Sequence, residues 1–128
     1  MEHVIDINKH RQLEIAIVRK LEKEGFKVNA THIGHPDGPP IKSFLHPARY
    51  GFKPYKPDIL ACKGSEKYFI EIVTRKRINK QAINKLLALS SMKGYKLGII
   101  APKSSIDSIK NIAKDNNIQY SKLWSLDI

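Results

Sequence analysis

The stretch KPDILACKGSEKYFIEIVTRK, residues 56–76, decides how the fold of this chain is predicted. The apolar runs at 59–62 and 67–74 each predict a β-strand, and the residues between them have turn chemistry. Asp58 opens the first strand, and Glu71 lies in the middle of the second. The segment therefore predicts an antiparallel hairpin that carries two carboxylates.

The second strand is apolar on both faces, apart from Glu71. Alternation places Glu71 on one face with Phe69 and Val73, and the other face consists of Tyr68, Ile70 and Ile72. Apolar residues on both faces are typical of a central strand that is covered on both sides. We therefore expect Glu71 to be a charged group near the middle of a buried sheet, where a carboxylate needs a partner.

Apolar spacing outside the hairpin predicts the remaining elements. Helices are expected over 7–24, 79–92 and 104–115, and strands over 26–33, 96–101 and 118–123. The predicted order is α-β-β-β-α-β-α-β in a single domain over 1–128, without an internal repeat. Strands that alternate with helices in the second half favour an α/β fold whose sheet has a parallel component.

The chain is strongly basic. Among 128 residues, 23 Lys and Arg oppose 12 Asp and Glu, which gives a formal net charge of +11. Such an excess favours a polyanionic partner, most simply nucleic acid, because cations neutralise phosphates and release counterions. The alternative is that a small protein can be basic for other reasons.

Cysteine usage and hydropathy indicate the compartment. The single cysteine, Cys62, excludes an internal disulfide and a cysteine zinc cluster, which fits a reducing cytosol. Residues 1–8 do not resemble a signal peptide, and no apolar run approaches the roughly 20 residues of a membrane span. We expect a cytoplasmic protein, or an intracellular one encoded by a virus or plasmid, without a membrane partner.

A long segment over 32–57 contains six of the seven prolines. Loops of this length are usually functional or disordered. Basic and aromatic residues alternate within it, as on surfaces where cations contact phosphates and rings stack on bases. The candidate nucleic-acid contacts here are Lys42, His46, Arg49, Tyr50, Lys53, Tyr55 and Lys56. The alternative is that Phe44 and Phe52 close the edge of the core while the lysines are only solvated.

Asp58 and Glu71 can converge at one end of the sheet because they lie on adjacent antiparallel strands. With Glu14 and the main-chain carbonyl of Ile72, they would form a hard oxygen site of the kind that Mg²⁺ accepts, with Mn²⁺ as a substitute. Such a metal lowers the pKa of water and neutralises charge on a phosphodiester. A basic protein with acidic metal ligands has the layout expected of a nuclease.

Glu14 lies inside the apolar stripe of the first helix, over Leu21. A carboxylate in such a stripe must be paired, hydrated or bound to metal. The alternative is that Glu14 lies at the end of the stripe, where it reaches solvent or pairs with a lysine.

These features resemble the PD-(D/E)XK nuclease superfamily, which includes restriction endonucleases and archaeal Holliday-junction resolvases. The resemblance covers about 13–123, and it rests on Pro57-Asp58, the hairpin spacing to Glu71, the helix that follows and the strand-helix-strand tail. It implies a restriction-endonuclease-like three-layer core, in which helices flank a mixed central sheet. It further implies an endonuclease for which DNA is expected as the partner ahead of RNA, and resolvase-like members form dimers, so a homodimer is one possible state.

Carried over by position, the resemblance implies that Asp58, Glu71 and Glu14 are the metal-binding and catalytic acids, and that Gln81 matches a glutamine found in some members. The chain departs from the pattern at Val73, where the family normally has a lysine that positions or activates the attacking water.

A cation from another element could replace that lysine, and Lys76 and Lys80 are the nearest candidates. Lys80 would swing back from the start of the helix, although it could equally be a solvated residue. Arg75, Lys76 and Arg77 could together form a phosphate clamp.

The sequence leaves three functions open. The first is a metal-dependent endonuclease that hydrolyses phosphodiesters, in particular those of branched or otherwise structured DNA. The second is a nucleic-acid-binding module that has the same fold but has lost cleavage, as Val73 suggests. The third is an interaction subunit whose positive charge meets an acidic protein.

Overall fold

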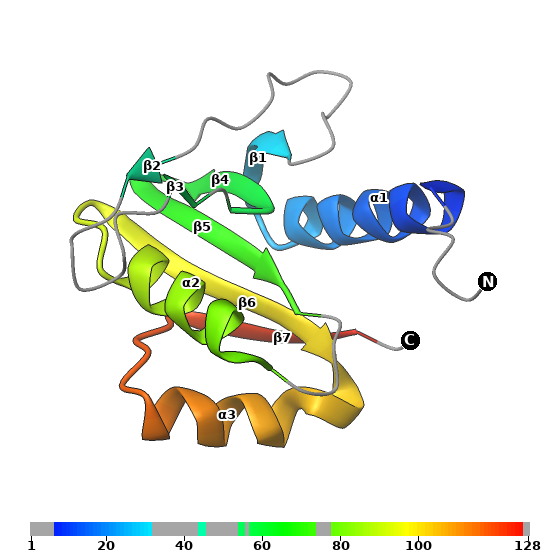
Figure 1. The fold of residues 1–128 in the computed structure, drawn as a ribbon. Coiled ribbons are helices and arrows are strands. Elements are labelled where there is room, and N and C mark those ends of the chain that lie inside the picture. The colour runs from blue at the N-terminus through cyan, green and yellow to red at the C-terminus, as the bar shows by residue number, and fades with distance from the viewer. Residues whose placement is uncertain (1–6, 32–43, 46–53, 56, 74–77, 127–128) are drawn as a thin grey trace.

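A five-stranded mixed sheet forms the centre of the computed structural model, which describes residues 7–31, 44–45, 54–55, 57–73 and 78–126 (Figure 1). Across the sheet the strands are β1 (Lys27–Thr31), β4 (Ile59–Lys63), β5 (Glu66–Ile72), β6 (Tyr95–Pro102) and β7 (Lys122–Leu126). β1, β4 and β5 are antiparallel neighbours, whereas β5, β6 and β7 are parallel. The predicted hairpin is therefore β4–β5, and β5 is the central strand.

Three α-helices cover the sheet within the described residues: α1 (Ile7–Lys23), α2 (Lys80–Ser90) and α3 (Ile106–Asp115), the last preceded by a 3₁₀ turn η2 (Lys103–Ser105). The chain passes from β5 through α2 to β6, and from β6 through α3 to β7, as parallel strands require. None of the described helices is long and apolar enough to cross a membrane.

Two hydrophobic clusters lie on opposite faces of the sheet. α1 contributes Ile17 and Leu21 to one cluster, where they pack with Tyr68 and Ile70 of β5. α2 and α3 contribute to the other, which contains the fully buried Phe69. The alternation predicted for β5 is confirmed, because successive side chains enter different clusters. α1 thus lies on one side of the sheet, and α2 and α3 on the other (Figure 1).

The predicted element order is confirmed for the five long strands and three helices. The structure adds a two-stranded sheet within the proline-rich segment, formed by β2 (Phe44–Leu45) and β3 (Pro54–Tyr55). Each of these two strands is too short to produce an alternating pattern in the sequence.

The predicted last strand at 118–123 is wrong in its bounds, because β7 begins at Lys122. Asn117 takes a left-handed backbone conformation with φ 56°. The Ile118 N–H then donates to the Ala113 carbonyl at 2.8 Å and completes the end of α3. Ile118 is buried against the α2–α3 side of the sheet. Ile118 therefore has the apolarity of a strand residue, although it terminates a helix.

Gly98 on β6 leaves room for the ring of Trp124. A Cβ atom at position 98 would lie 2.7 Å from Trp124 Cζ3. The ring has little freedom to move, because Trp124 Nε1 donates to Glu24 Oε1 at 2.9 Å and the side chain is buried.

Gly98→Ala is therefore expected to lower the free energy of unfolding by about 1–3 kcal/mol, the usual cost of overpacking. Urea unfolding followed by circular dichroism measures this loss. In a Trp124→Leu background the added methyl group has space, so the loss should shrink. An equal loss in both backgrounds would contradict the steric explanation.

Candidate active site

Asp58 and Glu71 lie together at the end of the β4–β5 hairpin that is opposite its turn. The Asp58 N–H donates to Glu71 Oε1 at 2.9 Å. In return, the Ile72 N–H donates to Asp58 Oδ2 at 2.8 Å. Each carboxylate therefore accepts a hydrogen bond from the backbone beside the other acid. The sequence prediction that these two acids meet is confirmed by this reciprocal pair of bonds.

Glu71 is buried, with an exposed fraction of 7%, whereas Asp58 is half-buried. Burial, and after it the negative charge of Asp58, raise the pKa of Glu71 from its ordinary 4.5 to about 8. Lys85 and the hydrogen bond from the Asp58 backbone oppose this rise only in part. A cation bound beside the pair would therefore favour the charged form of Glu71.

The cation that contacts this pair is Lys85 on α2. Lys85 Nζ lies 3.1 Å from Glu71 Oε2, and its side chain is only 26% exposed. Glu71 and α2 are on the same side of the sheet, so the lysine reaches the carboxylate directly. A partly buried ion pair of this length is a charge-assisted hydrogen bond, which is stronger than a neutral one.

The position that a lysine would occupy two residues after Glu71 is part of the core. Val73 packs against the hydrophobic cluster beneath α2 and α3, and its N–H donates to the Ile100 carbonyl at 2.8 Å. Lys80, the predicted replacement, is exposed at the first turn of α2, and Lys85 rather than Lys80 pairs with Glu71. Gln81 is also exposed.

Glu14 is not brought to the acid pair. It lies half-buried on α1, and α1 packs on the face of the sheet opposite to Glu71. Among the residues that the structure describes, no three His, Cys, Asp or Glu side chains lie close enough to hold an ion together. The backbone of Ile72 adjoins the pair through its N–H, which is bonded to Asp58.

The donor set nevertheless fits a magnesium ion. Mg²⁺ is usually bound through one or two carboxylates and keeps several waters or takes substrate phosphates. Asp58 and Glu71 provide two hard oxygen donors that backbone hydrogen bonds hold beside each other, and a bound cation would offset the burial that raises the pKa of Glu71. The two acids would hold the ion without a third protein ligand.

The predicted nucleic-acid contacts lie almost entirely outside the described residues: Lys42, His46, Arg49, Tyr50, Lys53, Lys56, Arg75, Lys76 and Arg77. Tyr55 belongs to β3, where its backbone pairs with Phe44 of β2. The role of these side chains therefore remains a prediction from the sequence.

Sequence reasoning missed Lys85, although the helix carries a signal for it. Ala82, Lys85 and Leu89 follow at intervals of three and four residues, so the lysine interrupts the apolar stripe of α2. Leu89 is fully buried in this stripe. A lysine at such a position needs an acidic partner, just as Glu71 on β5 needs a basic one.

Comparison with known proteins finds no match to a family model, to a curated protein or to a solved structure.

Proposed function

We propose that the protein is a metal-dependent endonuclease that hydrolyses phosphodiesters of DNA on a restriction-endonuclease-like core. The observation that carries the proposal is the contact between Asp58 and Glu71, with Lys85 at 3.1 Å from Glu71 Oε2. Two acids and a lysine at the end of a central hairpin are the groups that the resemblance to PD-(D/E)XK nucleases calls for. The helix-sheet-helix layering and the element order support the same family.

In this proposal each residue has a defined task. Asp58 and Glu71 would hold Mg²⁺ or Mn²⁺, which lowers the pKa of water and neutralises charge on the phosphodiester when bound. Lys85 would provide the positive charge that Val73 cannot, because its ammonium group approaches the acids from α2. The backbone bonds between the two acids hold both carboxylates in place before substrate arrives.

The net charge of +11 supports nucleic acid as the substrate. Lysines and arginines attract the phosphates and bring the strand to the protein. The site itself is acidic, so it repels a polyanion unless a metal ion is bound there. The same charge excess predicts that binding weakens steeply as salt is raised.

Asp58→Asn is expected to reduce cleavage at least about 100-fold, because it removes a charged metal ligand. The amide oxygen can still accept the hydrogen bond from Ile72, so the fold should persist. The assay uses labelled junction, duplex and single-stranded DNA with Mg²⁺ or Mn²⁺. Asp107→Asn, which removes an exposed acid from the first turn of α3, is the matched control. Absence of cleavage by the unmodified protein on all three substrates would refute the proposal.

The second candidate is a nucleic-acid-binding module without cleavage. Its supporting observation is that the reciprocal backbone bonds and the Lys85 ion pair already satisfy the two acids as a structural clasp. This candidate predicts salt-dependent binding that Glu71→Gln leaves intact, with no hydrolysis under any metal. Hydrolysis that Glu71→Gln abolishes would exclude it.

A further inference from the structure

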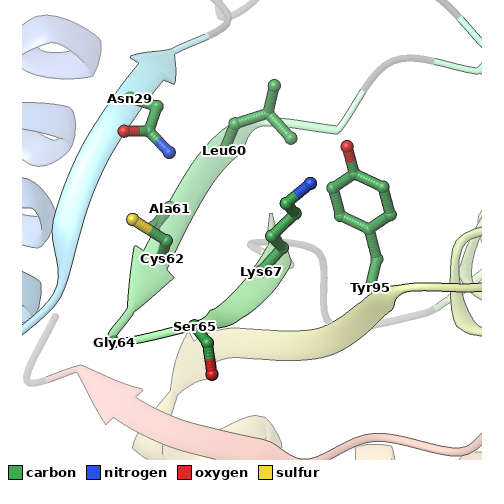
Figure 2. A pocket seen from close by; sticks show the side chains of 8 residues that line it. All are labelled: Asn29, Leu60, Ala61, Cys62, Gly64, Ser65, Lys67 and Tyr95. Atoms are coloured by element: carbon green, nitrogen blue, oxygen red, sulfur yellow. The ribbon is translucent and has the colours of Figure 1, made fainter.

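A cavity of about 340 Å³ lies on the β4–β5 hairpin near its turn, and Figure 2 shows the side chains that line it. Its volume is in the range of sites for small ligands. The residues that line it include Asn29, Leu60, Cys62, Ser65, Lys67 and Tyr95. They come from β1, β4, β5, β6 and the hairpin turn, so the cavity spans most of the antiparallel half of the sheet.

The cavity opens on the same face of the hairpin as the acid pair. The register opposes Cys62 to Lys67 and Leu60 to Phe69, and the next pair on this face joins Asp58 and Glu71. Lys67 and Glu71 are four residues apart on β5, which corresponds to about 13 Å at 3.3 Å per residue. The Leu60–Phe69 pair, whose Leu60 also lines the cavity, therefore lies between Lys67 and the acids.

The side chains of β4 on this face are less buried than those on the other face. Burial along β4 alternates, because Ile59 and Ala61 are buried on the α1 side, whereas Leu60 and Cys62 are half-exposed on the other. α2 packs chiefly on β6, and Leu60 packs against the cluster to which α2 contributes. An extended ligand that occupied the cavity would therefore pass over the partly exposed side chain of Leu60 to reach Asp58.

The lining has the charge that a phosphate needs. Of its described residues, Lys67 is the one cation, and none is a carboxylate. Tyr95 is fixed by stacking on Phe69, with ring centroids 4.1 Å apart, and Lys67 Nζ lies 5.8 Å from the centre of the Tyr95 ring. Figure 2 shows Lys67 and Tyr95 side by side, with polar ends facing the same space.

The nearest carboxylate in sequence, Glu66, does not offset Lys67. Alternation places Glu66 on the opposite face of β5, where it pairs with Lys96. Asn29 and Ser65 add neutral polar side chains to the lining of the cavity. The cavity therefore presents a cation, hydrogen-bonding groups and an aromatic ring, which together suit the backbone of a nucleic-acid strand.

We infer that this cavity holds the sugar-phosphate backbone of the substrate strand on one side of the scissile bond, with Lys67 contacting a phosphate. The inference rests on the proposed function, which places the scissile bond at Asp58 and Glu71. The distance of about 13 Å along β5 can be spanned by a few nucleotides of one strand. The cavity is thus a subsite for the flanking strand.

Cys62 reports whether the cavity is occupied, because it is the only cysteine of the chain and lines the cavity. The experiment follows alkylation of Cys62 by N-ethylmaleimide in EDTA, using the full chain with Glu71→Gln to prevent cleavage. A 20-base-pair DNA at saturating concentration is expected to slow alkylation at least about fivefold. Inorganic phosphate at equal ionic strength should give no protection. Protection by phosphate alone would overturn the inference in favour of a free-anion site.

Lys67→Ala should weaken DNA binding about tenfold. It should also make the plot of log K against log salt concentration less steep, by about the amount expected for one phosphate contact. Lys63→Ala is the matched control, because Lys63 is on the same hairpin but faces the α1 side, with Nζ 5.3 Å from the centre of the Phe26 ring. It should change affinity less than twofold. Equal weakening by both substitutions would overturn the inference.

The inference and the proposed function can fail separately. In one outcome, cleavage depends on Asp58, but bound DNA does not change the rate of Cys62 alkylation. This outcome would overturn the cavity subsite and would leave the proposed hydrolysis unaffected. Protection of Cys62 that is lost in Lys67→Ala, in a protein that cleaves no DNA, would support the cavity and refute the proposed hydrolysis.

Discussion

Lys85→Ala is expected to lower the rate of Mg²⁺-dependent DNA cleavage about 10²–10³-fold, the effect of removing one preorganised charged donor from an active site. Lys85 is the cation that contacts Glu71, at 3.1 Å. Its loss also removes the charge that holds the pKa of Glu71 down, so the remaining activity should shift to higher pH. Single-turnover cleavage of a labelled duplex across pH 6–9 measures both effects.

Lys80→Ala is the matched control, because it removes the same charge from the exposed first turn of α2. Cleavage should stay within about threefold of the unmodified protein, since an exposed lysine there contributes only screened charge. Lys85→Arg should restore part of the rate, and DNA affinity should be unchanged in all three variants. A Lys85→Ala protein that cleaves as fast as the control would refute the role of Lys85.

Glu71→Gln is expected to increase stability at alkaline pH in metal-free buffer. The pKa of Glu71 is 4.5 in its ordinary state and about 8 in the folded protein, so between these values the folded state keeps a proton that the unfolded chain has released. The contribution of Glu71 to the free energy of unfolding is therefore fully present below pH 4.5 and is lost as pH rises from there through 8. The loss is at most about 1.4 kcal/mol per pH unit over this window.

A glutamine does not titrate, so the Glu71→Gln protein should show no such decline. The two proteins should have similar free energies of unfolding near pH 4.5, whereas the variant should be more stable by a few kcal/mol at pH 8.5. Urea unfolding at intervals between these pH values measures the difference. Glu22→Gln, at an exposed position of α1, should keep the decline of the unmodified protein. The same decline in Glu71→Gln would contradict the assignment of the titration to this carboxyl.

The hairpin and its acids could be predicted because their signals are local. Alternation along 67–74 gave both faces of β5, and a glutamate among apolar strand residues marked Glu71 as a group in need of a partner. The meeting of Asp58 with Glu71 followed from antiparallel pairing alone. The end of α3 was misjudged, because Ile118 has the apolarity of a strand residue and its hydrogen bond to Ala113 is invisible in the sequence.

The lysine of the site could not be assigned by proximity in the sequence. Lys80 is nearer to β5 along the chain, but the helical turn directs it to solvent, and Lys85 reaches Glu71 because it lies on the inward stripe of α2. The resemblance and the apolar stripe of the first helix both predict Glu14 beside the acids. The stripe of α1 packs on the opposite face of the sheet, a fact that depends on the tertiary arrangement.

The cavity beside Cys62 had no sequence signal of its own. Its lining combines β1, β4, β5 and β6, and the separate residues are ordinary for strands and turns. Only the register that opposes Cys62 to Lys67 brings a thiol, an ammonium group and the Tyr95 ring to one place.

We expect Asp58 and Glu71 to bind one divalent ion together. Anomalous diffraction from crystals grown with Mn²⁺ at pH 8.5 tests this, because Glu71 is then largely deprotonated. A Mn²⁺ peak is expected with a carboxylate oxygen of each acid among its ligands, and no peak in crystals of Asp58→Asn. Crystals at saturating Mn²⁺ that show no peak at these acids, with the Lys85–Glu71 ion pair intact, would contradict it.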